Sequence, residues 1–206
     1  MVRGAVQKKE AGGARRPDRR VIRTKTAIRE ALKTLLTQKR MEEITVTELA
    51  CLAGVNRKTF YNYYSGVYSV MDEIEDEIAG NFRKAFENVN FQTVIRNPDE
   101  AFHRLDVWIM SDEKFYEKVM TLESQYSLRQ KIMDSLKETM WKSLSPHFRD
   151  DQQLALEVAI EYGISGILEV YRKWFLCGKK TDLATITDDI RMVTLDGILG
   201  LAKEYR

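Results

Sequence analysis

The sequence predicts an all-α protein with a small N-terminal unit and a larger helical body. Only three prolines interrupt its 206 residues, and apolar residues recur at the i, i+3, i+4 spacing of amphipathic helices. No segment has the strict alternation or the Asn-Gly turns that mark a β-hairpin. We therefore expect an arm over residues 1–18, a three-helix unit over 19–66 and a helical body over 67–206.

Charge is divided unequally between the two ends of the chain. Residues 1–64 contain 15 lysines and arginines against 6 aspartates and glutamates, a net charge of +9, whereas residues 65–206 contain 18 against 25, a net charge of −7. A basic segment joined to an acidic one is typical of proteins that bind nucleic acid, because only the binding part has to displace counterions from phosphates.

Residues 1–18 hold basic residues among Gly and Pro, with almost nothing to bury. We expect a disordered arm there, which either follows phosphates or a minor groove, or serves only as a solubilising extension. The first helix should run from about 19 to 38, with an apolar face that contains Ile28, Leu32 and Leu35. Its first turns carry four candidate phosphate ligands: Arg19, Arg20, Arg23 and Thr24.

The stretch from Thr45 to Tyr64 has the features of a helix-turn-helix. Thr45 stands three residues before Glu48, which is the spacing of a reciprocal capping box. Gly54 then lies where the chain must turn, and Asn56 is a favourable N-cap for a second, short helix. A short helix with few residues to bury and many hydrogen-bond donors predicts insertion into a DNA groove.

Contacts to DNA can be assigned by side-chain chemistry. Arg57 and Lys58 would contact bases or phosphates, and Asn62 a base or a phosphate. Tyr61 and Tyr63 would offer hydroxyls to phosphates or ring edges to thymine methyl groups. Backbone oxygens are the expected partners of Thr47 and Thr59, and Asn56 completes the predicted site, whereas Phe60 and Tyr64 should lie in the core.

Residues 19–78 resemble the DNA-binding domain of the tetracycline-repressor (TetR) family of transcriptional regulators. The matching residues are Thr24, Ile28, Ala31, Leu32, Leu35, Ile44-Thr45-Val46, Leu49-Ala50, Ala53-Gly54-Val55 and Thr59-Phe60-Tyr61-Asn62-Tyr63-Tyr64. One departure is Ser65-Gly66-Val67-Tyr68, which lacks the lysine that many members place near a phosphate at this point. The resemblance implies a homodimer that binds a palindromic operator in double-stranded DNA.

The body should consist of further helices. One is expected from Val67 to about Val89, others begin near Asn97-Pro98-Asp99 and Ser111-Asp112-Glu113, and an amphipathic stretch ends at Leu144. A helix over 151–177 should precede a last one that begins near Thr187, with Asp188-Asp189 as first-turn charges.

Two glycine pairs stand out in the last two predicted helices, Gly163 with Gly166 and Gly197 with Gly200. Each glycine inside a helix costs about 1 kcal/mol relative to alanine, so a close approach of backbones would explain them. The resemblance implies that these helices form a four-helix interface about a two-fold axis. Pairing of the two helices within one subunit, or local bending, are the alternatives.

The resemblance also implies a pocket for an effector in the body. The candidates are large apolar residues, for which ordinary core packing is the alternative: Trp108, Phe115, Tyr126, Met133, Trp141, Tyr162 and Trp174. The expected effector is an apolar small molecule that releases a repressor from its operator by binding the non-operator conformation better. An activator, or gating by a protein partner, remains the alternative.

Other classes of function find little support in the sequence. There is no glycine-rich phosphate loop, no nucleophile elbow and no Cys or His cluster with metal-ligand spacing, so we expect no enzyme, no metal and no cofactor. No apolar run reaches the roughly 18 residues of a membrane span. Cys51 and Cys177 are expected to be buried, reduced thiols of a cytoplasmic protein. A protein-interaction module that has lost its operator, and a helical enzyme, are the competing hypotheses.

Overall fold

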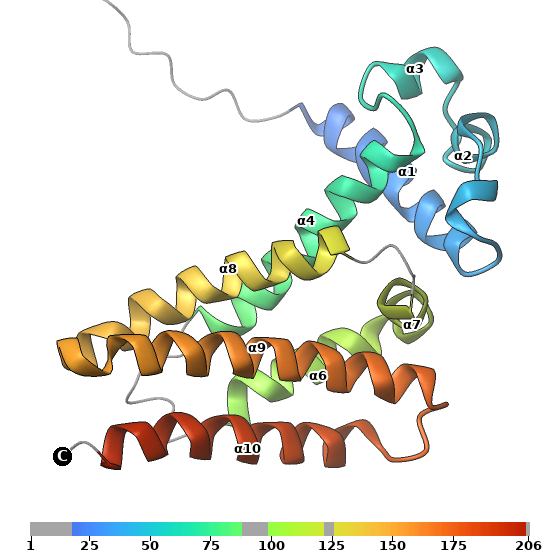
Figure 1. The fold of residues 1–206 in the computed structure, drawn as a ribbon. Helices are drawn as coiled ribbons and strands as arrows, with labels where there is room; N and C mark the ends of the chain where they lie inside the picture. Colours follow the sequence, from blue (N-terminus) through green and yellow to red (C-terminus); the bar gives the residue numbers. More distant parts are fainter. Residues whose placement is uncertain (1–17, 88–98, 122–125, 205–206) are drawn as a thin grey trace, which may run out of the picture.

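A computed structural model describes residues 18–87, 99–121 and 126–204, and its regular elements in these ranges are all helices (Figure 1). This confirms the predicted all-α class. Short 3-10 turns are η1 (Met41–Glu43), η2 (Ser145–His147) and η3 (Asp150–Gln152). The α-helices are α1 (Arg19–Leu36), α2 (Val46–Leu52), α3 (Arg57–Tyr61), α4 (Val67–Phe86), α6 (Asp99–Ser111), α7 (Glu113–Thr121), α8 (Tyr126–Leu144), α9 (Gln153–Leu176) and α10 (Leu183–Glu204).

Helices α1 to α3 form one small unit, which we call the head. Ile28 and Leu32 of α1, Leu49 of α2 and Phe60 of α3 are all 0% exposed, so one shared core holds the three helices together. Asp18 caps α1, because its Oδ1 accepts a hydrogen bond from the Arg20 amide at 3.0 Å. Helix α1 ends at Leu36, two residues before the expected end.

The predicted capping box at the start of α2 is only half formed. Thr45 Oγ1 accepts a hydrogen bond from the Glu48 amide at 3.2 Å, as expected. The Glu48 carboxylate does not complete the reciprocal bond, because it pairs with Lys39 Nζ instead. The Lys39 ammonium group, which folding brings close, has therefore replaced the Thr45 backbone amide as the partner of the Glu48 carboxylate.

The turn between α2 and α3 follows the predicted chemistry. Gly54 has φ = +67°, a left-handed conformation that costs a residue without a Cβ least. Asn56 then caps α3, since its Oδ1 accepts a hydrogen bond from the Thr59 amide at 2.8 Å.

Helix α4 joins the head to the remaining helices, α6 to α10, which we call the body (Figure 1). Five of the six residues over 72–77, which we call the acid segment, carry a carboxylate. On the head side, Lys25 pairs with Glu73 at 2.6 Å, and Arg29 pairs with Glu73 at 2.7 Å and with Glu77 at 3.3 Å. These ion pairs attach α1 to the first half of α4.

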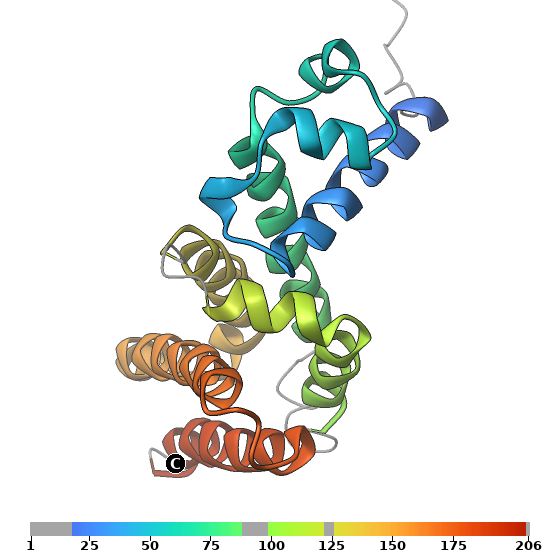
Figure 2. The ribbon, with the colours of Figure 1, turned by 90° about the vertical axis from the view of Figure 1, so that its right-hand side faces the viewer.

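Helix α4 and the long helices of the body pack in a ring. Helix α8 lies along α4, α9 along α8 and α10 along α9, and α6 contacts both α10 and α4 to close the ring (Figures 1 and 2). The ring encloses large side chains that are at most 1% exposed, among them Leu105, Ile132, Ile164 and Tyr171. Helix α7 packs against α9 and also contacts α1 of the head.

The last helix begins at Leu183, four residues before the predicted start near Thr187. Asp182, which the sequence analysis overlooked, accepts a hydrogen bond from the Thr185 amide at 2.9 Å and so provides a capping group for the first turn. Asp188 and Asp189 therefore lie in the second turn, and their assignment as first-turn charges was wrong.

Both cysteines are free thiols, but the prediction that they are buried was wrong. Cys51 lies on the exposed side of α2, while Leu49 and Ala50 fill the core on the other side. Cys177 is the C-cap of α9, directly after the last residue of the helix, and its side chain is exposed. Over the ranges that the structure covers, no helix is long and apolar enough to cross a lipid bilayer.

Candidate nucleic-acid interface

Helix α3 is held to the head by its aromatic residues and exposes its polar ones. Phe60 is 0% and Tyr64 5% exposed, which confirms their assignment to the core. Arg57, Lys58 and Asn62 are exposed on the opposite side. The start of α1 and helix α3 both lie at the end of the molecule that is remote from α10 (Figures 1 and 2). Two of the predicted contact regions thus share one end of the protein.

The aromatic candidates on and after α3 differ in accessibility. Tyr61 is 50% exposed and packs edge-on against Phe60, with 5.6 Å between the ring centroids. Tyr63 is half-buried and packs against the core, so less of its surface is free for a ligand. Thr59 is also half-buried, and the Asn56 side chain already serves as the cap of α3.

The basic residues of the head fall into two groups. One group forms ion pairs with Glu30, Glu42, Glu48, Glu73 or Glu77 and consists of Lys25, Arg29, Lys33, Lys39 and Arg40. A second group is exposed and pairs with no carboxylate among the described residues: Arg19, Arg20, Arg23, Arg57 and Lys58. We call this second group the unpaired cations. All five belong to the predicted DNA site, and no carboxylate in the described part of the chain neutralises their charge.

The remaining candidates lie at the edges of this site. Thr24 is half-buried on α1, and Thr47 is exposed in the first turn of α2. Tyr68 was not assigned to the site from the sequence, although its side chain is 66% exposed in the first turn of α4. Tyr68 belongs to the segment 65–68, in which this chain lacks the lysine that many TetR-family members place near a phosphate.

One face of α9 and α10 is apolar, exposed and hollowed. Leu154, Val158 and Tyr162 recur every four residues along α9 and are 72%, 60% and 74% exposed, and Val193 of α10 is 62% exposed. Between the helices runs a groove of about 380 Å³, whose lining includes Gly166 and Gly197. An apolar strip of this length is typical of a surface that another chain covers.

The four glycines do not play one common role. A Cβ on Gly163 would lie 3.1 Å from Cγ2 of Thr194, so this glycine permits the close approach of α9 and α10 within one subunit. A Cβ on Gly166, Gly197 or Gly200 would meet no atom within 4 Å. These three glycines face outward from the described helices rather than toward a neighbour in the same chain.

The seven candidates for an effector pocket are spread over the body. Phe115 and Trp174 are 1% and 8% exposed, and the Trp174 indole donates a hydrogen bond to the Thr181 carbonyl at 2.7 Å. Trp108 packs against the rings of Phe82 and Tyr116, and Met133 against the core. Tyr162 lies on the exposed face of α9, and Tyr126 begins α8 with a side chain outside the described residues.

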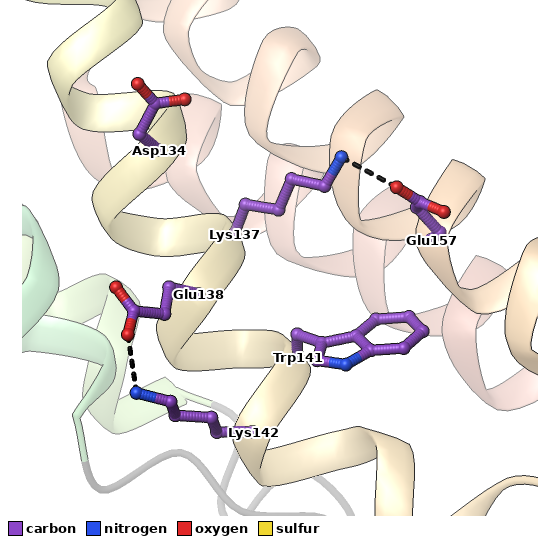
Figure 3. A pocket seen from close by; sticks show the side chains of 6 residues that line it. All are labelled: Asp134, Lys137, Glu138, Trp141, Lys142 and Glu157. Carbon is purple, nitrogen blue, oxygen red and sulfur yellow. Dashed lines mark hydrogen bonds and ion pairs between the residues drawn. The ribbon is translucent and has the colours of Figure 1, made fainter.

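Trp141 lines a separate groove of about 400 Å³ between α8 and α9 (Figure 3). The indole lies on the same side of α8 as the ion pair of Lys137 with Glu157 at 2.8 Å, whereas Lys142 pairs with Glu138 at 2.5 Å on the other side of the helix. Five of the six residues that line this groove carry a charge, but their apolar stems and the indole provide most of its surface. Of the seven candidates, only Trp141 lies in this groove.

A buried polar cluster joins α6, α9 and α10. Asp106 Oδ1 accepts hydrogen bonds from Thr187 Oγ1 at 2.6 Å and from the Tyr171 hydroxyl at 3.3 Å. Burial raises the pKa of Asp106, although these two hydrogen bonds oppose the shift. This cluster was not predicted from the sequence, because its three residues are far apart in the chain and match no motif.

No family model matches the chain, and no curated protein matches it by sequence. Solved structures do resemble it. The fatty acid degradation regulator FadR of Bacillus halodurans is similar at a TM-score of 0.64 and 21% identity, over 85% of this chain and 96% of that chain. A tetR-family transcriptional regulator from Streptomyces coelicolor gives 0.62 and 12%, over 89% and 83%. FadR of Bacillus subtilis, solved in complex with stearoyl-CoA, gives 0.60 and 18%, over 84% and 98%.

These identities are too low to transfer a function, but the overlap covers the head and the body together. The order of the helices, the helix-turn-helix and the ring of long helices behind it agree with that overlap. The chain therefore has the fold of the TetR-family transcriptional regulators.

Proposed function

We propose that the protein is a homodimeric, DNA-binding transcriptional regulator of the cytoplasm. In this proposal residues 19–66 form the DNA-binding domain, and residues 67–206 form the regulatory and dimerisation domain. The observation that carries the proposal is the set of unpaired cations at the end of the head, beside an α3 whose exposed residues are polar. The basic arm over 1–18 lies outside the described residues except for Asp18, and its contact with DNA is part of the proposal.

Recognition of an operator needs two heads, because one short helix reaches only a few base edges. The exposed apolar face of α9 and α10 supports a two-fold interface with a second copy of the chain. The outward-facing Gly166, Gly197 and Gly200 would allow the helices of the two subunits to approach closely there. In this dimer, two copies of α3 would enter successive major grooves of a palindromic operator.

We infer further that the regulator is a repressor, released when an apolar small molecule binds the body. The B. subtilis FadR structure, solved with stearoyl-CoA, supports an acyl-type effector. A molecule of this kind would act by binding the conformation that does not fit the operator, since equal affinity for both conformations changes nothing.

Selection of bound fragments from random duplex DNA tests the central claim. We expect a palindrome whose two halves lie about one helical turn apart. Light scattering of the complex should give two chains for each duplex. A monomer, or binding that shows no sequence preference over bulk competitor DNA, would refute the proposal.

The mode of control is tested separately. Stearoyl-CoA, used as the probe, should raise the dissociation constant for the selected operator, and a reporter gene under that operator should be derepressed when the protein is deleted. A reporter that falls silent on deletion would instead identify an activator. Stable operator binding at saturating probe would exclude this class of effector.

A further inference from the structure

The acid segment of α4 is held between two sets of cations, one from the head and one from the body. Glu73 and Glu77 pair with α1, as described above. The other three carboxylates, of Asp72, Glu75 and Asp76, turn toward α8, where Lys131 contacts all of them. Since Asp72, Glu75 and Asp76 are in the first half of α4, the body contacts this helix close to the head.

Lys131 makes an unusually dense set of contacts for one ammonium group. Its Nζ lies 2.9 Å from Asp76 Oδ1 and 3.3 Å from Glu75 Oε2, and it also pairs with the Asp72 carboxylate. It donates a further hydrogen bond to the Asp72 carbonyl oxygen at 3.0 Å. Partial burial by itself would lower the pKa of Lys131, but the hydrogen bonds to the carboxylates outweigh it and raise the pKa above the ordinary value.

Removal of this ammonium group would leave the acid segment in an unfavourable state. The Glu75 side chain is 12% exposed, and its other hydrogen bond comes from the Ser127 hydroxyl at 2.8 Å. A carboxylate that is largely buried loses more by losing its cation than an exposed one does. Asp72 and Asp76 stand one helical turn apart, where like charges repel. The first half of α4 would therefore shift away from α8 or fluctuate against it.

We propose that Lys131 is a positioning residue for DNA binding: it locks the head-proximal half of α4 to the body and thereby fixes where each head is held. This inference rests on the proposed function, because the spacing of two heads matters only if both must fit one operator. Buried apolar residues of α4 such as Ile74 and Ile78 hold the helix in the ring, and Lys131 fixes the angle between α4 and α8. Loss of Lys131 should widen the range of head positions without unfolding the body.

The two native cysteines allow a direct test. Cys51 is exposed on α2 of the head, and Cys177 is exposed at the end of α9 in the body. Spin labels on both, in full-length protein mixed with an excess of unlabelled C51S/C177S chain, report the distance between head and body within one subunit by pulsed electron resonance. Dilution leaves at most one labelled chain in each oligomer, so the measurement works for a dimer and for a monomer.

The matched control lies six residues further along α8. Lys137 also pairs with two carboxylates, Glu157 at 2.8 Å and Glu161 at 3.4 Å, but both belong to α9 rather than to α4. We expect K131M to broaden the distance distribution at least about twofold, K131R to restore a narrow one, and K137M to leave it unchanged. An unchanged distribution in K131M, or equal broadening in K137M, would overturn the proposal.

A second variant covers the case in which K131M fails to fold. Asp72 and Asp76 are 65% and 64% exposed, so D72N/D76N removes two partners of Lys131 without leaving a buried cavity. Some broadening is expected, but less than in K131M, because Lys131 still pairs with Glu75 and the two neutral amides no longer repel each other. Broadening equal to that of K131M would contradict the role assigned to Glu75, and a distribution as narrow as that of the wild type would refute a role for the ion pairs with Asp72 and Asp76.

DNA binding gives an independent readout. K131M should bind the selected palindrome about tenfold more weakly and a single half-site with unchanged affinity, because only simultaneous binding of both heads depends on their spacing. Equal losses on both duplexes would indicate a merely structural role and overturn the inference. If the wild type binds no duplex, the proposed function fails, whereas the distance measurement still decides whether Lys131 holds the head.

Discussion

The division of the head's basic residues into paired and unpaired groups predicts which of them set the salt dependence of DNA binding. Arg23 and Lys25 are two residues apart on α1 and offer a matched comparison. Arg23 is exposed and free of any described carboxylate, whereas Lys25 pairs with Glu73 at 2.6 Å and lies over the Tyr64 ring at 5.3 Å from its centroid. Methionine at either position removes the charge and retains a long side chain.

The magnitude follows from counterion release. If all five unpaired cations of each protomer contact phosphates, a dimer neutralises about ten, and the slope of log K against log salt is about −9 from the described part of the chain. R23M removes two of these contacts per dimer and should make the slope less negative by about 1.8. K25M should change the slope little, because that charge is already neutralised by α4.

The assay is fluorescence anisotropy with the selected operator at a series of salt concentrations between about 50 and 200 mM, a range over which such complexes lose several orders of magnitude in affinity. Thermal unfolding of both variants controls for loss of the head's structure. If K25M reduced the slope as much as R23M, the ion pairs seen on α1 would not protect their cations from DNA. The distinction between the two groups would then be wrong.

Three further predictions concern stability and assembly. N56A should lose about 1 kcal/mol of unfolding free energy in urea, since Asn56 caps α3; an unchanged midpoint would contradict this. G166L should convert the dimer to a monomer by light scattering, while G80L, where an added Cβ also meets no atom within 4 Å but which lies on α4, should remain dimeric. Burial raises the pKa of Asp106 above its ordinary value, so the folded state binds this proton more tightly than the unfolded chain, and its contribution to stability is lost as pH rises through the folded pKa. D106N should therefore flatten the decline of melting temperature that begins as pH rises above the ordinary pKa of an aspartate, about 4, and an unchanged pH profile would show that Asp106 does not cause it.

The local features of the head could be predicted because they depend on neighbours in the sequence. Gly54 at positive φ, Asn56 as a cap and Phe60 in the core each follow from residues within one or two turns. The failures have the opposite cause. The Glu48 carboxylate does not complete the capping box, because it pairs with Lys39, which the folded chain brings close from the segment after α1. Asp182 was overlooked as the cap of α10 because a pair of acids further on resembled a first turn.

The functional surfaces show the same limit. The sequence shows that residues 1–64 have a net charge of +9, but it does not tell which cations are neutralised inside the fold, because that depends on the position of Glu73 and Glu77 on α4. The effector candidates had apolar character in common, and the fold distributes them between the core, the groove at Trp141 and the exposed face at Tyr162. Membership of one pocket is a long-range property that helical spacing alone does not encode.

The same salt measurement can decide between the two hypotheses for the arm. Residues 1–16 contain five lysines and arginines, as many as the unpaired cations of the head. If the arms of a dimer follow phosphates, about ten additional counterions are released and the full-length slope exceeds that of a chain lacking residues 1–16 by up to about 9 units. If the arm is only a solubilising extension, both proteins have the same slope and the same operator affinity. A change in affinity at low salt that disappears at high salt would identify sequence-independent attraction, whereas a loss confined to operators with an A·T-rich flank would indicate insertion of the arm into a minor groove.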